Sequence, residues 1–209
     1  MTLATRSKLS IAPAFNGAIS RQQIETVGDG VGITQVTAWS FLHVRGTSAE
    51  KLLSGPYSFS QMTIGAIEQV ADGILVRLRR DEFLLLTTDL KTAIDHLDPK
   101  SVEGLVTLTD ITHGRGVIGL FGPRAQDVLP KICALDFSQG KFPDMHAAQA
   151  MLANVRALVF RMDSAQLPGY FVIVDRSLTG YVWQIILDAV HEWGGVALNP
   201  DSLDRKRIK

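Results

Sequence analysis

The chain carries one sequence pattern twice, and a duplicated pattern predicts a duplicated structural unit. Residues 41–53 read FLHVRGTSAEKLL and residues 117–129 read VIGLFGPRAQDVL. Each copy begins with an apolar run typical of a strand, passes through a glycine, and ends in a segment with helical spacing. Gly46 corresponds to Gly122, and glycine lets the backbone leave a strand in a conformation that other residues rarely adopt. We therefore expect a strand, a sharp turn and a helix in each half of the chain.

The side chains at these turns suggest how each helix begins. In the first copy, Thr47 or Ser48 can cap the helix. In the second copy, Pro123 suits the first helical position, where its missing N–H group costs nothing. Asp89 and Ser177 hold equivalent places before a second helix in each copy, and both are expected to act as N-caps.

The rest of each copy adds strands and that second helix. Strands are expected at residues 82–88 and 170–175, and the helices that follow them are expected to end near Leu97 and Trp193. The last helix has apolar residues at helical spacing, and Gly194 can end it. Further strands are expected at residues 33–36, 67–70, 73–78, 106–109 and 155–161. Each half reads roughly as β-α-β-β-α, which predicts an α+β fold.

A chain of 209 residues suits one domain made of two such halves. We expect a domain over residues 31–198, with halves over about 31–100 and 101–198, a flexible arm over residues 1–30 and a charged tail over residues 199–209. The glycines at positions 28, 30 and 32 resemble a phosphate loop in composition. A strand is expected after them where a dinucleotide-binding loop needs a helix, so they are interpreted as a turn.

The charge and the cysteine content limit which classes of partner and which cellular compartment we expect. Lys plus Arg and Asp plus Glu both number 21, so the formal net charge is zero. Nucleic acids and anionic membranes favour basic proteins, so neither is expected as a partner. The one cysteine, Cys133, cannot form an internal disulfide, and the apolar runs are too short to span a bilayer. We expect a cytoplasmic protein.

The residues that carry most enzymatic chemistry do not form a recognisable motif here. None of the five histidines has metal-ligand spacing to another histidine or to Cys133, so no metal site is expected. His43 alternates with apolar neighbours on a strand and is expected to face solvent or a partner. Arg161, Arg176 and Trp183 could form a binding site, and an arginine–aromatic cluster in a core or an interface is an equal alternative.

Two longer segments resemble a known family. Residues 109–129, TDITHGRGVIGLFGPRAQDVL, resemble the strand, Gly-Pro and helix signature of the glycine-cleavage T-protein (aminomethyltransferase) superfamily. Residues 171–183, FVIVDRSLTGYVW, and residues 80–86, RDEFLLL, are similar to the gamma subunits of heterotetrameric sarcosine oxidases within that superfamily. The resemblance covers residues 32–194, and its most specific part is the Arg-Ser-x-x-x-Tyr-x-Trp string that starts at Arg176.

The resemblance implies a fold and a complex. The fold implied is the T-protein-like folate-binding domain without the C-terminal barrel of the full enzyme. The complex implied joins this chain to larger flavin-containing and folate-binding subunits, which oxidise sarcosine and pass the one-carbon unit to tetrahydrofolate. Flavin and NAD are expected only in those partners, so the chain is expected to be a non-catalytic subunit of an oxidoreductase.

Departures from the family pattern bear on folate binding. The family has paired aspartates where this chain has Asp72 and Gly73, and a pterin-binding glutamate where this chain has Phe171. A phenyl ring would leave pterin N–H donors unpaired, at roughly 1–3 kcal/mol each. Asp72 is the one candidate catalytic acid. It would serve the alternative, a stand-alone folate-binding aminomethyltransferase-like protein that binds tetrahydrofolate. A self-associating structural domain, a homo-oligomer without a small-molecule role, is the third hypothesis.

Overall fold

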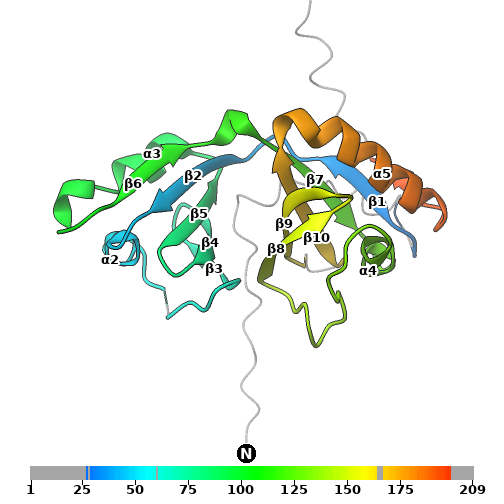
Figure 1. Cartoon of the computed structure of the whole chain (residues 1–209), viewed down its shortest axis with the longest axis horizontal. Coiled ribbons are helices and arrows are strands. Elements are labelled where there is room, and N and C mark those ends of the chain that lie inside the picture. The colour runs from blue at the N-terminus through cyan, green and yellow to red at the C-terminus, as the bar shows by residue number, and fades with distance from the viewer. Residues whose placement is uncertain (1–26, 28, 60, 164–166, 199–209) are drawn as a thin grey trace, which may run out of the picture.

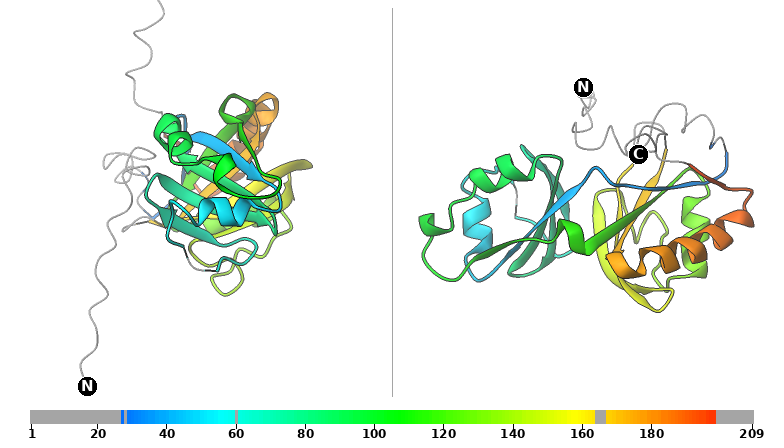
Figure 2. Two further views of the ribbon diagram at one scale, coloured as in Figure 1. Left: turned by 90° about the vertical axis from the view of Figure 1, so that its left-hand side faces the viewer. Right: turned by 90° about the horizontal axis from the view of Figure 1, so that it is seen from above.

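The computed structural model describes residue 27 and residues 29–59, 61–163 and 167–198. These residues form two sheets that face each other, with helices on the outer face of each sheet (Figures 1 and 2). The α+β class and the T-protein-like arrangement without a closed barrel are confirmed. Most of the expected N-terminal arm and the tail at residues 199–209 lie outside the described residues.

The first sheet has five antiparallel strands in the order β3-β4-β5-β2-β6. Their bounds are β2 Ser40–Arg45, β3 Ile67–Val70, β4 Gly73–Arg79, β5 Glu82–Thr87 and β6 Thr107–Asp110. The second sheet has six strands in the order β11-β1-β7-β10-β9-β8. Their bounds are β1 Gly32–Gln35, β7 Arg115–Phe121, β8 His146–Leu152, β9 Val155–Arg161, β10 Gly169–Asp175 and β11 Val196–Ala197.

The helices are short except for the last. The α-helices are α2 Ala49–Leu53, α3 Leu90–Asp95, α4 Ala125–Val128 and α5 Thr179–His191. The 3₁₀ turns are η1 Pro99–Ser101, η2 Thr112–Gly114, η3 Leu129–Lys131 and η4 Arg176–Leu178. Within the described residues, no helix combines the length and apolar character that crossing a membrane requires.

The repeat seen in the sequence is a structural repeat. The order β2-α2-β3-β4-β5-α3 in the first half returns as β7-α4-β8-β9-β10-α5 in the second. Gly46 and Gly122 have φ values of +129° and +121°, which L side chains rarely adopt. A Cβ atom at Gly46 would lie 2.1 Å from the Leu105 carbonyl oxygen, and one at Gly122 would lie 2.5 Å from that of Gly30. Glycine is therefore required at both positions, because the backbone conformation disfavours other residues and because a Cβ atom would clash with a carbonyl oxygen.

The two halves exchange their leading strands. The strand that precedes the first unit, β1, pairs with β7 of the second, whereas β6, which precedes the second unit, pairs with β2 of the first. Each sheet thus takes one strand from across the division near residue 100. The exchange ties the halves together through backbone hydrogen bonds as well as through the core.

Three apolar layers hold the molecule together. One lies between the first sheet and helices α2 and α3, and another between the second sheet and helices α4 and α5. The third lies between the two sheets. Both sheets are consequently apolar on both faces, which explains why their central strands read as nearly continuous apolar runs.

The cap predictions are confirmed at one position and wrong at another. Asp89 caps α3, because its Oδ1 accepts the Thr92 N–H at 3.1 Å. Ser177 does not cap α5: it lies inside η4, and the N-cap position of α5 belongs to Leu178. An extra 3₁₀ turn between strand and helix moves the start of α5 two residues beyond Ser177.

The predictions at the two glycine turns also need correction. Ser48 occupies the N-cap position of α2 but makes no cap hydrogen bond, since its hydroxyl donates to the Glu103 carbonyl oxygen across the turn. Pro123 lies in the turn before α4, which begins at Ala125. The turn at Gly122 therefore uses more residues than the sequence pattern indicates, whereas α2 begins directly after Ser48.

Candidate functional site

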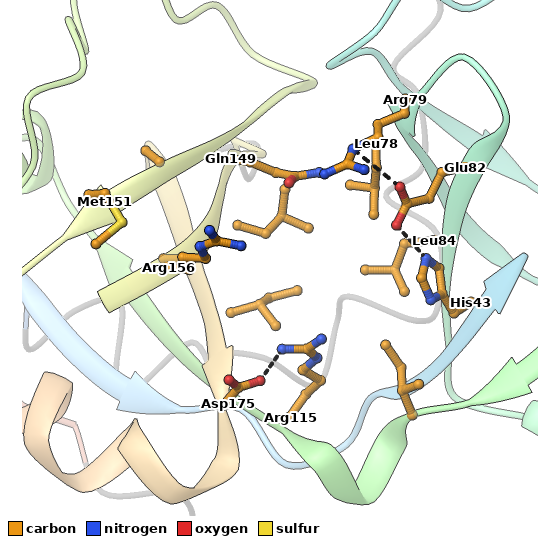
Figure 3. Close-up of a pocket in the computed structure, with 15 residues that line it drawn as sticks. His43, Leu78, Arg79, Glu82, Leu84, Arg115, Gln149, Met151, Arg156 and Asp175 are labelled. Carbon is orange, nitrogen blue, oxygen red and sulfur yellow. Dashed lines mark hydrogen bonds and ion pairs between the residues drawn. The ribbon is translucent and has the colours of Figure 1, made fainter. Parts of the chain in front are cut away.

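A cleft of about 680 Å³ lies between the two sheets and is the first candidate for a functional site (Figure 3). Its floor is apolar and includes Leu84 from the first sheet and Leu158 and Ile173 from the second. Charged side chains surround this floor, and they are His43, Arg79 and Glu82 from the first sheet and Arg115, Arg156 and Asp175 from the second.

The first sheet contributes a linked acid and base. His43 on β2 and Glu82 on β5 lie on adjacent antiparallel strands, in which His43 pairs with Leu84 and Glu82 pairs with Arg45. The two side chains meet diagonally, with His43 Nε2 2.8 Å from Glu82 Oε1. Arg79 Nε lies 3.4 Å from the other carboxylate oxygen, Oε2. Burial lowers the pKa of His43 below its ordinary value, and the hydrogen bond to Glu82 offsets part of that shift. His43 therefore favours the neutral form more than an exposed histidine does.

The second sheet contributes mainly positive charge. Arg115 at the start of β7 forms an ion pair with Asp175 at the end of β10. Arg156 on β9 is exposed and makes no ion pair with any residue that the structure describes. The cleft thus has three guanidinium groups against two carboxylates, so it attracts negatively charged groups.

The types of side chain that line the cleft limit the chemistry that they could perform. Among the residues that the structure describes, no serine, threonine, cysteine, lysine or tyrosine lines the cleft, so none of the described lining side chains is a nucleophile of those types. Across the described residues, no group of three or more histidine, cysteine, aspartate or glutamate side chains is placed to hold a metal ion. The cleft offers hydrogen-bond donors, charge and apolar contact.

Next to the cleft, packed aromatic rings fill the space between the sheets. Phe171 on β10 stacks on Phe160 of β9, with ring centroids 4.8 Å apart and planes at 14°. The ring centroids of Trp39 and Phe171 are 4.9 Å apart. Phe121 meets the Phe171 ring edge-on, with the two ring centroids 5.4 Å apart. Phe171 is 1% exposed, so the position at which the family pattern has a glutamate is here part of the core.

Asp72 lies away from the cleft. It occupies the turn between β3 and β4, at the opposite end of β4 from Arg79 and therefore roughly 20 Å away along the strand. Its Oδ2 accepts the Tyr57 hydroxyl at 2.7 Å and lies 2.7 Å from His96 Nδ1. Burial, together with this hydrogen bond, raises the pKa of Tyr57. A folate role for Asp72 stays a prediction.

Arg161 is fixed inside the protein. Its Nε and Nη2 atoms bind both carboxylate oxygens of Asp163 at 2.9 and 2.8 Å, and Nη1 donates to the Phe142 carbonyl oxygen at 3.2 Å. Its guanidinium also lies over the Tyr170 ring. The hydrogen bonds to Asp163 raise the pKa of Arg161 despite its burial. Its donors are directed at groups within the fold.

Arg161, Arg176 and Trp183 have different surroundings and share no contact that the structure records. Arg176 is exposed on η4 and lines a second cavity. Trp183 is half-buried on α5 and packs against the core beneath that helix. The three residues therefore do not form one site.

The cleft residues were not singled out as a group by the sequence. His43 was expected to face solvent or a partner, and it faces the cleft because it shares a strand face with Phe41 of the core between the sheets. Arg115, Glu82 and Asp175 likewise lie two residues from members of that core on their own strands. Alternation along the strands could have identified them, given which strand face meets the other sheet.

Comparison with known proteins gives a family match over nearly the whole chain. The model of the family described as the GCVT N-terminal domain matches residues 7–208. Sarcosine oxidase subunit gamma from Corynebacterium sp. (strain U-96) is 24% identical over 198 residues, which cover 92% of this chain and 95% of that subunit. Sarcosine oxidase subunit alpha from Corynebacterium sp. (strain P-1) is 23% identical over 192 residues, which cover 82% of this chain. This chain spans only 20% of the alpha subunit's length.

The fold is also found in a solved structure. A chain of the heterotetrameric sarcosine oxidase from Corynebacterium sp. U-96, in complex with pyrrole 2-carboxylate, matches with a TM-score of 0.68 at 24% identity. The match covers 78% of this chain and 85% of that one. The sequence resemblance to this superfamily, and within it to the gamma subunit, is confirmed.

Proposed function

This chain belongs to the family of the GCVT N-terminal domain, and from that membership we propose that it is a gamma-type subunit of a sarcosine-oxidase-like complex. In this role it is non-catalytic and supports larger subunits. Those subunits hold the flavin and NAD, oxidise a secondary N-methyl amine such as sarcosine, and pass the one-carbon unit to tetrahydrofolate. The site of action proposed is the cytoplasm, in keeping with a single cysteine, Cys133, that is unpaired and buried.

The observation that carries this proposal is the length of the match to the gamma subunit. It covers 92% of this chain and 95% of the relative, so the two chains correspond almost end to end. The alpha subunit also contains a region similar to this chain, but that region is one fifth of a much longer protein. A subunit-for-subunit correspondence therefore favours the gamma role.

The packing between the sheets supports the absence of a cofactor in this chain. A pterin needs a carboxylate or similar acceptor for its N–H donors, and Phe171 and Phe160 place apolar rings at the relevant strands. Asp72, the candidate acid for folate binding, already accepts one hydrogen bond from the Tyr57 hydroxyl and lies beside His96. These contacts favour a folate-type scaffold that holds no folate of its own.

The cleft supports a role in assembly. Its arginines, together with the exposed Met151 at its edge, have the composition of a protein interface. Arg156 has no carboxylate partner among the described residues, so an acidic group on another subunit would pair with it at little cost. The proposal thus gives the cleft residues a use that needs no catalytic group.

Purification of the affinity-tagged full chain from the organism that encodes it tests the proposal. We expect flavin-containing larger subunits to co-purify in a fixed ratio, and we expect sarcosine to bleach the flavin absorbance when oxygen is absent. Recovery of the chain alone, without a flavoprotein, would overturn the proposal. Folate-dependent activity of the chain alone, abolished by Asp72→Asn, would favour the aminomethyltransferase-like alternative instead.

A further inference from the structure

Strand β6 ends the first sheet on one side, and in the part of the chain that the structure describes it pairs only with β2. The edges formed by β3 and β8 are different, because segments of the chain tie them to each other. The Ile67 N–H donates to the Met145 carbonyl oxygen, and the Ala147 N–H donates to the Gly65 carbonyl oxygen. The edge of β6 has no such cover.

The register of β6 on β2 shows which backbone groups face outward. The Ile111 N–H donates to the Phe41 carbonyl oxygen at 3.0 Å. In an antiparallel ladder, residues that bond to one neighbouring strand alternate with residues that face the other side. Thr109 therefore bonds toward β2, and Leu108 and Asp110 direct their N–H and C=O groups away from it. None of the described residues bonds to these four outward groups.

Strand β6 lacks the features that usually protect an exposed edge, which are lysine, proline and bulges. Its sequence, TLTD, contains neither lysine nor proline, and its four residues pair one to one with β2. Leu105, just before the strand, is 68% exposed. The Asp110 carboxylate accepts the Thr112 N–H at 2.9 Å, so it is held toward its own chain. Such an edge is a template for another strand.

We propose that β6 receives an extended segment of one of the larger subunits as a further strand of the first sheet. This inference rests on the proposed function and gives it a specific contact. Backbone hydrogen bonds to Leu108 and Asp110 would provide affinity, and alternate side chains would provide specificity. Ile111, which follows β6, lines the cleft, so the added strand would continue the surface assigned to assembly.

The two faces of β6 indicate which side chains the added segment needs. Leu108 packs against the apolar layer beneath α2 and α3, so the residue opposite it is apolar. Thr107 is exposed on the other face, next to Arg45 of β2. Arg45 is exposed and forms no ion pair with a described residue. An acidic residue opposite Thr107 would meet this charge, so the segment alternates apolar and acidic residues.

Two variants at one position test the contact. Leu108→Pro removes an outward N–H without breaking a bond to β2, and proline is tolerated where the N–H of an edge strand faces solvent. Leu108→Ala loses the same apolar side chain but keeps the donor. Each affinity-tagged full chain is purified from the organism that encodes it, and flavin is measured per mole of chain. We expect Leu108→Pro to recover at least about tenfold less flavin than Leu108→Ala.

The same purification separates failure of this inference from failure of the proposed function. Absence of flavin with the parent chain would overturn both. Equal recovery of flavin with the parent chain and with Leu108→Pro would overturn the β6 contact alone and leave the proposed function standing. Thermal unfolding of both variants shows whether each is folded.

Hydrogen exchange in the unsubstituted chain decides the question if Leu108→Pro does not fold. In the isolated chain, the Leu108 and Asp110 amides are expected to exchange fast and the Thr109 amide slowly, because only Thr109 bonds to β2. In the complex, residues 105–111 are expected to gain protection. Unchanged exchange there would overturn the proposal. Protection of Leu108 that rises with the concentration of the isolated chain would contradict it, since a second copy would then occupy the edge.

Discussion

The ring of Phe171 on β10 lies nearly parallel to the ring of Phe160 on β9, with centroids 4.8 Å apart. The two strands are neighbours in the second sheet, and Trp39 covers the pair from the connection between β1 and β2. Aromatic contacts of this kind stabilise a core beyond their buried area. The interior between the sheets is therefore a packed core at this point, and the open space begins at the charged cleft.

Removing the Phe171 ring tests that statement. Phe171→Ala is expected to lower the free energy of unfolding by about 3–5 kcal/mol, because it leaves a cavity among aromatic side chains. Urea denaturation measures the change. Met151→Ala is the control, since Met151 is 54% exposed at the edge of the cleft and its loss should cost less than about 0.5 kcal/mol. Similar costs for the two variants would show that Phe171 is not a core residue.

Replacement of glycine by alanine is expected to have opposite effects on stability at Gly46, which lies in a turn, and at Gly180, which lies in a helix. Gly46→Ala forces a side chain into a positive φ and against the Leu105 carbonyl oxygen, so it should destabilise the protein by more than about 1 kcal/mol. Gly180→Ala lies in α5 with open space around it and should stabilise by up to about 1 kcal/mol. Thermal unfolding of both variants checks the signs, and a neutral Gly46→Ala would refute the backbone argument.

The contacts of Arg161 predict a structural effect of its loss. Arg161→Gln leaves Asp163 and the Phe142 carbonyl oxygen without their donor, and should cost about 2 kcal/mol of stability. Arg176→Gln changes the same residue type at an exposed position and should cost less than about 0.5 kcal/mol. Denaturant titration compares the two. An equal, small effect would mean that the buried ion pair contributes little.

The environment of His43 predicts how stability changes with pH. Burial lowers the pKa of His43 below 6.5, so the folded state binds this proton less readily than the unfolded state. The contribution of His43 is present above pH 6.5 and is lost as the pH falls through the lower folded-state pKa. His43→Gln should therefore reduce the loss of stability on acidification, whereas Gln149→Ala in the same cleft should not.

The partner of His43 provides a second test of the same group. The hydrogen bond to Glu82 raises the pKa of His43 and so opposes burial. Glu82→Gln removes the carboxylate charge and should lower the pKa of His43 further. An NMR titration of the imidazole ring in both proteins measures the difference. An upward shift in the variant would contradict the geometry of the pair.

Much of this architecture could be predicted because it depends on local pattern. The repeat, the glycine turns and the strands at residues 73–78, 82–88 and 155–161 appear in the structure with bounds shifted by no more than one residue. Strand β8 was missed, because its alanines at positions 147, 148 and 150 have low strand propensity. Pairing with β9 compensates for that propensity, and pairing cannot be read from one segment alone.

The candidate site was harder to predict because it depends on long-range placement. The exchange of β1 and β6 between the halves brings the two sheets face to face, and no local pattern specifies it. Arg161 and Trp183 were grouped with Arg176 by residue type, but packing holds them in separate places. The cleft depends on which strand face of each sheet meets the other sheet.

As a gamma-type subunit, this chain is proposed to keep a folate-type scaffold without binding folate. Calorimetric titration of the purified full chain with tetrahydrofolate tests it most directly. With Phe171 and Phe160 packed between the sheets and Asp72 engaged by Tyr57, we expect no measurable binding heat. Saturable binding at micromolar or tighter affinity would contradict the claim.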